Sequence, residues 1–302
     1  MLREVLQLLR EEWRVIVIAV TSDCSGESLV HDYFKSANAS ILSWTKIADE
    51  IIRWLRSRPY LLAILRDVQL NLPTHHHGNS PLSVIRGVLT RWTSIYLAYR
   101  RLLQLRTALM VFVEDQRLFE SGTTESHAKT REMVDELKKP LLWHHLSRVK
   151  RHLEPLAIAA NITQANDCLL DQVLLTFGFV YNFFTSLTDL EDHPFRIAVC
   201  QSLERRWAKA DQDVFIAAVV LNPWLKMRPF QPNMQLFTEA AFHVILSRLW
   251  RRFYPDEPVP GSLFTEIQEY FDNTGNFESL HMTMDAISSQ ARDRVCFHMF
   301  HS

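Results

Sequence analysis

Glycine is scarce in this sequence. Seven glycines in 302 residues argue against a loop-rich β-sandwich and favour a helical protein, because glycine weakens helices and marks turns. Neither a GxGxxG nor a GxxxxGKS/T motif occurs. The sequence therefore argues against a dinucleotide-binding enzyme and against a P-loop enzyme.

Cysteine is also sparse, and no long apolar run stands out. The four cysteines are widely scattered without a CxxC pair: Cys24, Cys168, Cys200 and Cys296. This spacing predicts reduced thiols in an intracellular protein, not a disulfide framework or a zinc site. The apolar run Val15–Val20 is far shorter than the roughly 20 residues that cross a bilayer, so we expect no membrane partner. A formal net charge of -1 indicates no partner by itself.

One strand is expected near the start of the chain. Arg14–Val20 is a β-branched run followed by a polar turn, a pattern typical of a central strand that is covered on both faces. Asp213–Leu221 is apolar on all sides and fits either a strand or a buried helix. Apart from these two segments, strand signals nearly vanish.

Helical spacing of apolar residues dominates the rest of the sequence. Ile41–Leu70 is predicted to be helical with one break, at which Pro59 starts a second helix. Leu82–Phe119 indicates a helix or a closely spaced pair of helices. Leu141–Leu153 is expected to be a helix that ends near Pro155.

Four segments, in this order, carry a resemblance to a known family. Val15–Glu27 (VIVIAVTSDCSGE) looks like a ribonuclease H-like strand followed by a catalytic turn of the TDNAGE type. Thr90–Leu105 (TRWTSIYLAYRRLLQL) is similar to TRWNSTYxMLxRLLEL, and Leu153–Leu187 resembles an LxPLxxAT stretch. Arg206–Lys226 resembles RW…D…FLAAxLLDPRxK. In order and spacing, these segments resemble the hAT superfamily of DNA transposases in its fungal form.

The resemblance implies a ribonuclease H-like fold into which a large helical domain is inserted. We therefore predict a mostly α (α+β) protein with a partial ribonuclease H-like head and a helical insertion-type body. The expected boundaries place the partial ribonuclease H-like segment at residues 1–35 and the helical domain at 36–255. A linker, a short helix and a poorly ordered end are expected over residues 256–302.

The resemblance also implies a triad of two Asp and one Glu that holds Mg²⁺ or Mn²⁺ for strand cleavage. Asp23 matches one catalytic Asp, whereas the first Asp and the closing Glu of the family have no counterpart here. We therefore expect Asp23 to be a vestigial catalytic and metal-binding residue. The alternative is a turn residue that caps a helix. With one carboxylate of three, we expect a catalytically inactive, degenerate transposase without a cofactor.

The stretch from Val68 to Val113 contains the candidate DNA-binding residues, because it holds no Asp or Glu. Its arginines are Arg86, Arg91, Arg100, Arg101 and Arg106. An unbalanced basic patch attracts phosphate. Trp92 can stack on an unpaired base, and the resemblance implies that it stabilises distorted DNA at transposon ends. Alternatively, Trp92 forms a buried aromatic helix face with Tyr96 and Tyr99. The sequence leaves both interpretations open.

Two histidine-containing clusters and two tryptophans favour structural interpretations. His75, His76 and His77 indicate a solvated loop, because adjacent side chains seldom converge on one metal ion. A solvated helix face is expected for the basic cluster His144, His145, Arg148, Lys150, Arg151 and His152. Trp207 and Trp224 are predicted to pack in the core.

The sequence therefore predicts a nuclear, transposase-derived protein that binds DNA. Three alternatives stay open. The first is an active, metal-dependent transposase whose missing carboxylates are encoded elsewhere. The second is a helical protein-interaction scaffold with an incidental basic patch. The third is a relic without function.

Overall fold

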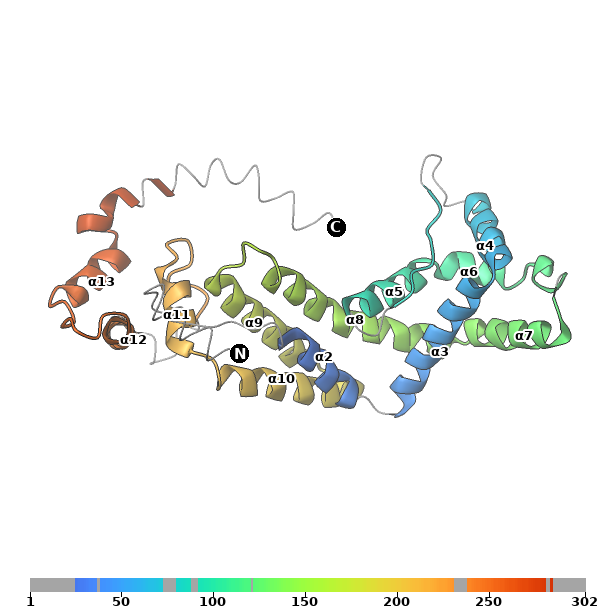
Figure 1. Cartoon of the computed structure of the whole chain (residues 1–302), viewed down its shortest axis with the longest axis horizontal. Coiled ribbons are helices and arrows are strands. Elements are labelled where there is room, and N and C mark those ends of the chain that lie inside the picture. Colours follow the sequence, from blue (N-terminus) through green and yellow to red (C-terminus); the bar gives the residue numbers. More distant parts are fainter. Residues whose placement is uncertain are drawn as a thin grey trace, which may run out of the picture. The chain divides into compact units, whose positions relative to one another are not determined.

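The computed structural model describes residues 25–36, 39–72, 80–87, 92–120, 122–230, 238–280 and 283–284. Within these ranges the chain is helical and contains no strand, which confirms the prediction of a mostly α protein (Figure 1). The strand expected over Arg14–Val20 lies outside the described residues, as does Asp23. Among the described helices, none combines the length and the apolar character that a membrane crossing requires.

The chain divides into two compact units. Of the described residues, the larger unit contains those within 25–164 and 177–206, and the smaller unit contains those within 165–176 and 207–284. The divisions fall inside α9 (Leu170–Thr185) and at the end of α10 (His193–Trp207). The domain boundaries expected at residues 35 and 255 stay predictions.

The larger unit is built around one long helix, α8 (Pro140–Thr163). The helices before it are α2 (Ser25–Ser36), α3 (Ala39–Ser57), α4 (Pro59–Asn71), α5 (Trp92–Gln104), α6 (Arg106–Phe112) and α7 (Thr124–Lys138), with the short 3-10 helix η1 (Gln116–Phe119). Helix α8 packs against α2, α3, α5 and α7. Pro59 and Pro140 occupy first turns, where the missing N–H breaks no helical hydrogen bond. The predicted helix start at Pro59 is confirmed.

Two sequence-based helix boundaries are wrong. Helix α8 does not end near Pro155 but continues to Thr163, with Pro155 buried inside it. The proline removes one backbone hydrogen bond, and the buried side chains on either side of it offset that loss by packing in the core: Leu153, Leu156, Ala157 and Ala160. The helix or closely spaced pair predicted from Leu82 is not helical over residues 80–87, and the described helices of this stretch are α5 from Trp92 and α6 after it.

A buried polar cluster joins α8 to α2 and to the 3-10 helix η2 (Leu190–Asp192). Tyr33, His152 and Asp192 expose no surface. Tyr33 Oη lies 3.1 Å from His152 Nδ1, and His152 Nε2 lies 3.2 Å from Asp192 Oδ1. Arg148 Nε lies 3.0 Å from the same oxygen, and Arg151 approaches Asp192 Oδ2 at 3.4 Å. The buried carboxylate is therefore neutralised by arginine, as a buried charge requires.

The imidazole of His152 is held in its neutral form. Burial lowers its pKa to about 4, and the charges of Arg151 and Arg148 act in the same direction, against the opposing effect of Asp192. The neutral ring suits Tyr33, because Nδ1 can accept a hydrogen bond from its hydroxyl. His152 Nε2 lies 3.2 Å from Asp192 Oδ1 without the geometry of a hydrogen bond. The cluster is thus compatible with one protonation state of His152.

The smaller unit contains α11 (Gln212–Leu221), α12 (Glu239–Phe253), α13 (Leu263–Asp272) and the short 3-10 helix η3 (Gly275–Phe277). Its core is Ala217, Val220, Phe242, Ile245, Leu249 and Ile267. Lys226 Nζ donates to Tyr270 O and to Asn273 Oδ1, each at 2.7 Å, and so places a cation at the negative end of α13. The segment left open between strand and helix, Asp213–Leu221, is a helix.

We predict that acidification destabilises the larger unit through His152. In the unfolded chain His152 titrates near 6.5, whereas its folded pKa is about 4. The unfolded state therefore binds more protons between these values, and stability present above pH 6.5 is lost as the pH falls toward 4, by about 1 kcal/mol per pH unit. Thermal unfolding followed by circular dichroism from pH 7 to pH 4.5 measures this loss.

His152→Gln is the matched control. A glutamine can accept from the Tyr33 hydroxyl and donate to Asp192, but it does not titrate. The fall in Tm across the same pH window should be smaller in this variant than in the unmodified chain. Equal falls in the two proteins would show that His152 does not cause the acid sensitivity.

Candidate nucleic-acid interface

Residues 80–87 form a non-helical segment, here called the strap, which precedes α5 (Figure 1). Gln69 of α4 pairs with both backbone groups of Leu82. Its Oε1 accepts from Leu82 N at 2.8 Å, and its Nε2 donates to Leu82 O at 3.1 Å. One side-chain amide therefore satisfies a donor and an acceptor of the same strap residue.

Two arginines hold the next two carbonyls of the strap. Arg101 of α5 donates to Ser83 O at 2.8 Å, and Arg56 of α3 donates to Val84 O at 2.7 Å. Arg86 lies on the strap itself and is exposed. Arginines from two separate helices therefore contact the strap, which carries a third, exposed arginine of its own.

These three arginines have no acidic partner within the described residues. The ion pairs of the larger unit there use Arg117, Lys129, Lys138, Lys139, Arg148, Lys150, Arg151, Arg205 and Arg206. Arg56, Arg86 and Arg101 occur in none of these pairs. Arg56 was not found from the sequence, because Asp49 and Glu50 lie near it in the same helix and hide it from a search for acid-free stretches.

The other predicted arginines are placed differently. Arg100 lies close enough to Glu154 of α8 for its charge to lower the pKa of that carboxyl. Burial raises this pKa, but hydrogen bonds from Lys150 and Tyr96, together with the charges of Lys150 and Arg100, bring it below its usual value. Arg106 lies over the ring of Trp143, also on α8, at 5.5 Å from the ring centroid. Arg91 lies outside the described residues.

Trp92 is buried in this structure, with 9% of its surface exposed. Tyr96 and Tyr99 on the same helix are also buried, as expected for an aromatic face packed in the core. A base can stack on Trp92 only if the ring leaves this position. The stacking role of Trp92 therefore stays a prediction that requires a local rearrangement.

The second basic cluster is largely occupied by acidic partners. Arg148 and Arg151 contact Asp192, and Lys150 Nζ lies 2.7 Å from Glu154 Oε1. His75, His76 and His77 lie outside the described residues. The prediction that Trp224 packs in the core is wrong: its side chain is 41% exposed, in the turn that follows α11.

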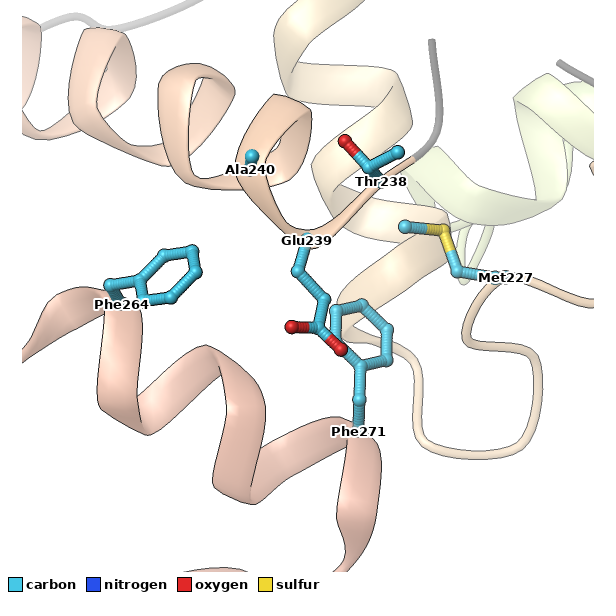
Figure 2. Close-up of a pocket in the computed structure, with 6 residues that line it drawn as sticks. All are labelled: Met227, Thr238, Glu239, Ala240, Phe264 and Phe271. Atoms are coloured by element: carbon cyan, nitrogen blue, oxygen red, sulfur yellow. The ribbon is translucent and has the colours of Figure 1, made fainter. Parts of the chain in front are cut away.

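A cavity of about 590 Å³ lies in the smaller unit, beside the start of α12. Figure 2 shows Phe264 and Phe271 projecting from α13, with the Glu239 side chain directed from α12 toward that helix. Glu239 is the one charged group among the described lining residues, and a carboxylate is favourable in the first turn of a helix.

Neither a metal site among the described residues nor a match to a known protein indicates a function for this chain. Nowhere in the part of the chain that the structure describes do three or more His, Cys, Asp or Glu side chains gather as a metal site. A scan against family models, a search of curated proteins and a search of solved structures each found no match to this chain. The residues around the strap are therefore the candidate functional site of this chain.

We predict that Trp92→Ala destabilises the larger unit. Removing a buried tryptophan side chain leaves a cavity and costs roughly 3 kcal/mol. Leu97→Ala on the same helix is the control, because Leu97 is 44% exposed and should change stability little. Urea unfolding of both variants measures the difference. Similar stabilities of the two variants would contradict the buried placement of Trp92.

Proposed function

We propose that this chain is a transposase-derived protein that binds DNA through the surface around the strap. The observation that supports the proposal best is that Arg56 and Arg101 bind the strap, that Arg86 is exposed on it, and that none of the three has an acidic partner among the described residues. A guanidinium group with unused N–H donors matches a phosphate in charge and in geometry. Arg91, which lies outside the described residues, and Arg100 and Arg106, which already face Glu154 and Trp143, are proposed as additional contributors.

The proposed origin is a hAT-type transposase with a partial ribonuclease H-like head and a nuclear location. Its support is the order of the sequence motifs, one of which overlaps α5 from Trp92 onward. The proposed present-day role is binding without catalysis, with Asp23 as a vestigial counterpart of one catalytic carboxylate. Divalent metal belongs to the ancestral reaction in this proposal.

Phosphate contacts should dominate this interaction. Arg56 and Arg101 bind the backbone of the strap and Arg86 lies on it, and the buried position of Trp92 offers no aromatic platform for a base. Backbone contacts fix register and orientation but carry no base information. Binding should therefore depend steeply on salt and only weakly on DNA sequence.

Fluorescence anisotropy with short single-stranded and hairpin DNA, measured across a salt series, tests the proposal. We expect Arg86→Gln to weaken binding and to reduce the slope of log K against log salt by about 1, as the loss of one phosphate contact predicts. Arg86 is exposed on the strap, so its replacement should leave the fold intact.

Arg117→Gln is the matched control, because it removes one positive charge, as Arg86→Gln does. Arg117 already pairs with Asp67 and Asp115, so its removal should leave the salt slope unchanged. Equal losses in the two variants would mean that net charge, and not the strap surface, attracts the DNA. If the folded chain does not bind DNA at low salt, the proposal is wrong and a protein-interaction scaffold becomes the better assignment.

A further inference from the structure

The strap is attached to the larger unit by side-chain contacts and not by backbone pairing. Its one fully buried side chain is Val84, which is 4% exposed, whereas Leu82 is 39% exposed. Ser83 and Arg86 are also exposed. Among the described residues, no backbone–backbone hydrogen bond joins the strap to another element. Segments with few buried contacts open at low free-energy cost compared with the helices around them.

The groove that holds the strap recognises main-chain atoms. Gln69, Arg101 and Arg56 together bind four backbone groups of three consecutive residues. Every peptide has these groups, so the contacts contribute affinity but little sequence preference. The same division of labour applies when a protein binds an extended peptide by its backbone and selects it through pockets for particular side chains.

Sequence preference comes from two positions of the strap. The first is Val84, which inserts into the apolar core beneath the groove. The second is Gly87, where an added Cβ would lie 3.3 Å from the Cα of Ile95 in α5. This contact is tight, so a larger residue at this position would require Ile95 to move by a few tenths of an ångström. The groove therefore selects a small aliphatic residue followed three positions later by glycine.

We propose that the groove formed by α3, α4 and α5 is a peptide-binding site that the strap occupies in cis. Its external ligand is an extended segment of a partner protein with the strap's own pattern, a small aliphatic anchor and a glycine three residues later. Such a segment enters when the strap is displaced. The proposal does not depend on DNA binding.

The strap competes with any added peptide for the groove, so peptide affinity must be measured on a variant whose strap is weakened. A tethered segment has an effective concentration in the millimolar range, so a free peptide competes poorly with an intact strap. Val84→Ser weakens the strap by removing its apolar anchor, and it introduces no charge near Arg56 or Arg101. The groove residues stay unchanged in this variant, which therefore makes the site available to an added peptide.

The test is a titration of the full-length chain into a fluorescein-labelled peptide with the strap sequence, SPLSVIRG. We expect the Val84→Ser protein to bind it at least tenfold more tightly than the unmodified chain. Binding should be reduced at least tenfold when the peptide carries serine at its anchor position, SPLSSIRG. A Val84→Ser protein that also carries Gln69→Leu should lose binding to a similar extent. Circular dichroism checks that each variant keeps its helices.

Absence of binding by a helical Val84→Ser protein would overturn the proposal, and so would equal binding of the two peptides. If Val84→Ser does not fold, hydrogen exchange of the unmodified chain provides the second measurement. A millimolar excess of SPLSVIRG should then speed exchange at the strap amides but not in α8. Unchanged exchange at the strap would equally overturn the proposal.

Discussion

The buried carboxylate of Asp192 constrains much of the larger unit. A charge with no exposed surface is strongly destabilising when its partners are removed, so the chain must place cations beside it. Arg148 supplies the main charge, and His152 fills the remaining space as a neutral ring. Through Tyr33 the same cluster reaches α2. One carboxylate thus determines how η2, α8 and α2 meet.

Helix α8 also determines which arginines stay available on the surface. Successive residues of a helix point about 100° apart, so Arg100 and Arg101 of α5 cannot serve the same neighbour. Arg100 is directed to Glu154 on α8, whereas Arg101 reaches the carbonyl of Ser83 on the strap. Arg106 is likewise drawn to α8 through the ring of Trp143. Packing against α8 therefore separates arginines that are neighbours in sequence: Arg100 and Arg106 interact with α8, whereas Arg101 faces the strap.

The helical class and several helix starts could be predicted from the sequence, because apolar spacing and proline position are local signals. Pro59 begins α4 as expected, but Pro155 does not end α8, because core packing on both sides of it outweighs one lost hydrogen bond. Asp213–Leu221 stayed ambiguous because it is apolar on every side. The burial of Trp92 was left open for a similar reason, since an aromatic helix face suits both a core and a stacking platform.

The site was only partly predictable because its contacts join residues that are distant in sequence. Arg86 and Arg101 were found by their acid-free neighbourhood, but Arg56 reaches Val84 across 28 positions from a helix that carries its own acids. The contact between Tyr33 and His152 spans 119 positions. No local pattern reports such contacts.

The acid-free stretch itself has two physical causes that the sequence cannot separate. Much of Val68–Val113 is buried against the other helices of the larger unit, and a buried helix face excludes carboxylates whether or not the opposite face binds phosphate. The absence of acids in the stretch is therefore weaker evidence for DNA binding than the absence of an ion pair at an exposed arginine. Arg86 meets this second criterion within the described residues, so its exposed position on the strap favours nucleic-acid binding more strongly than the composition around it does.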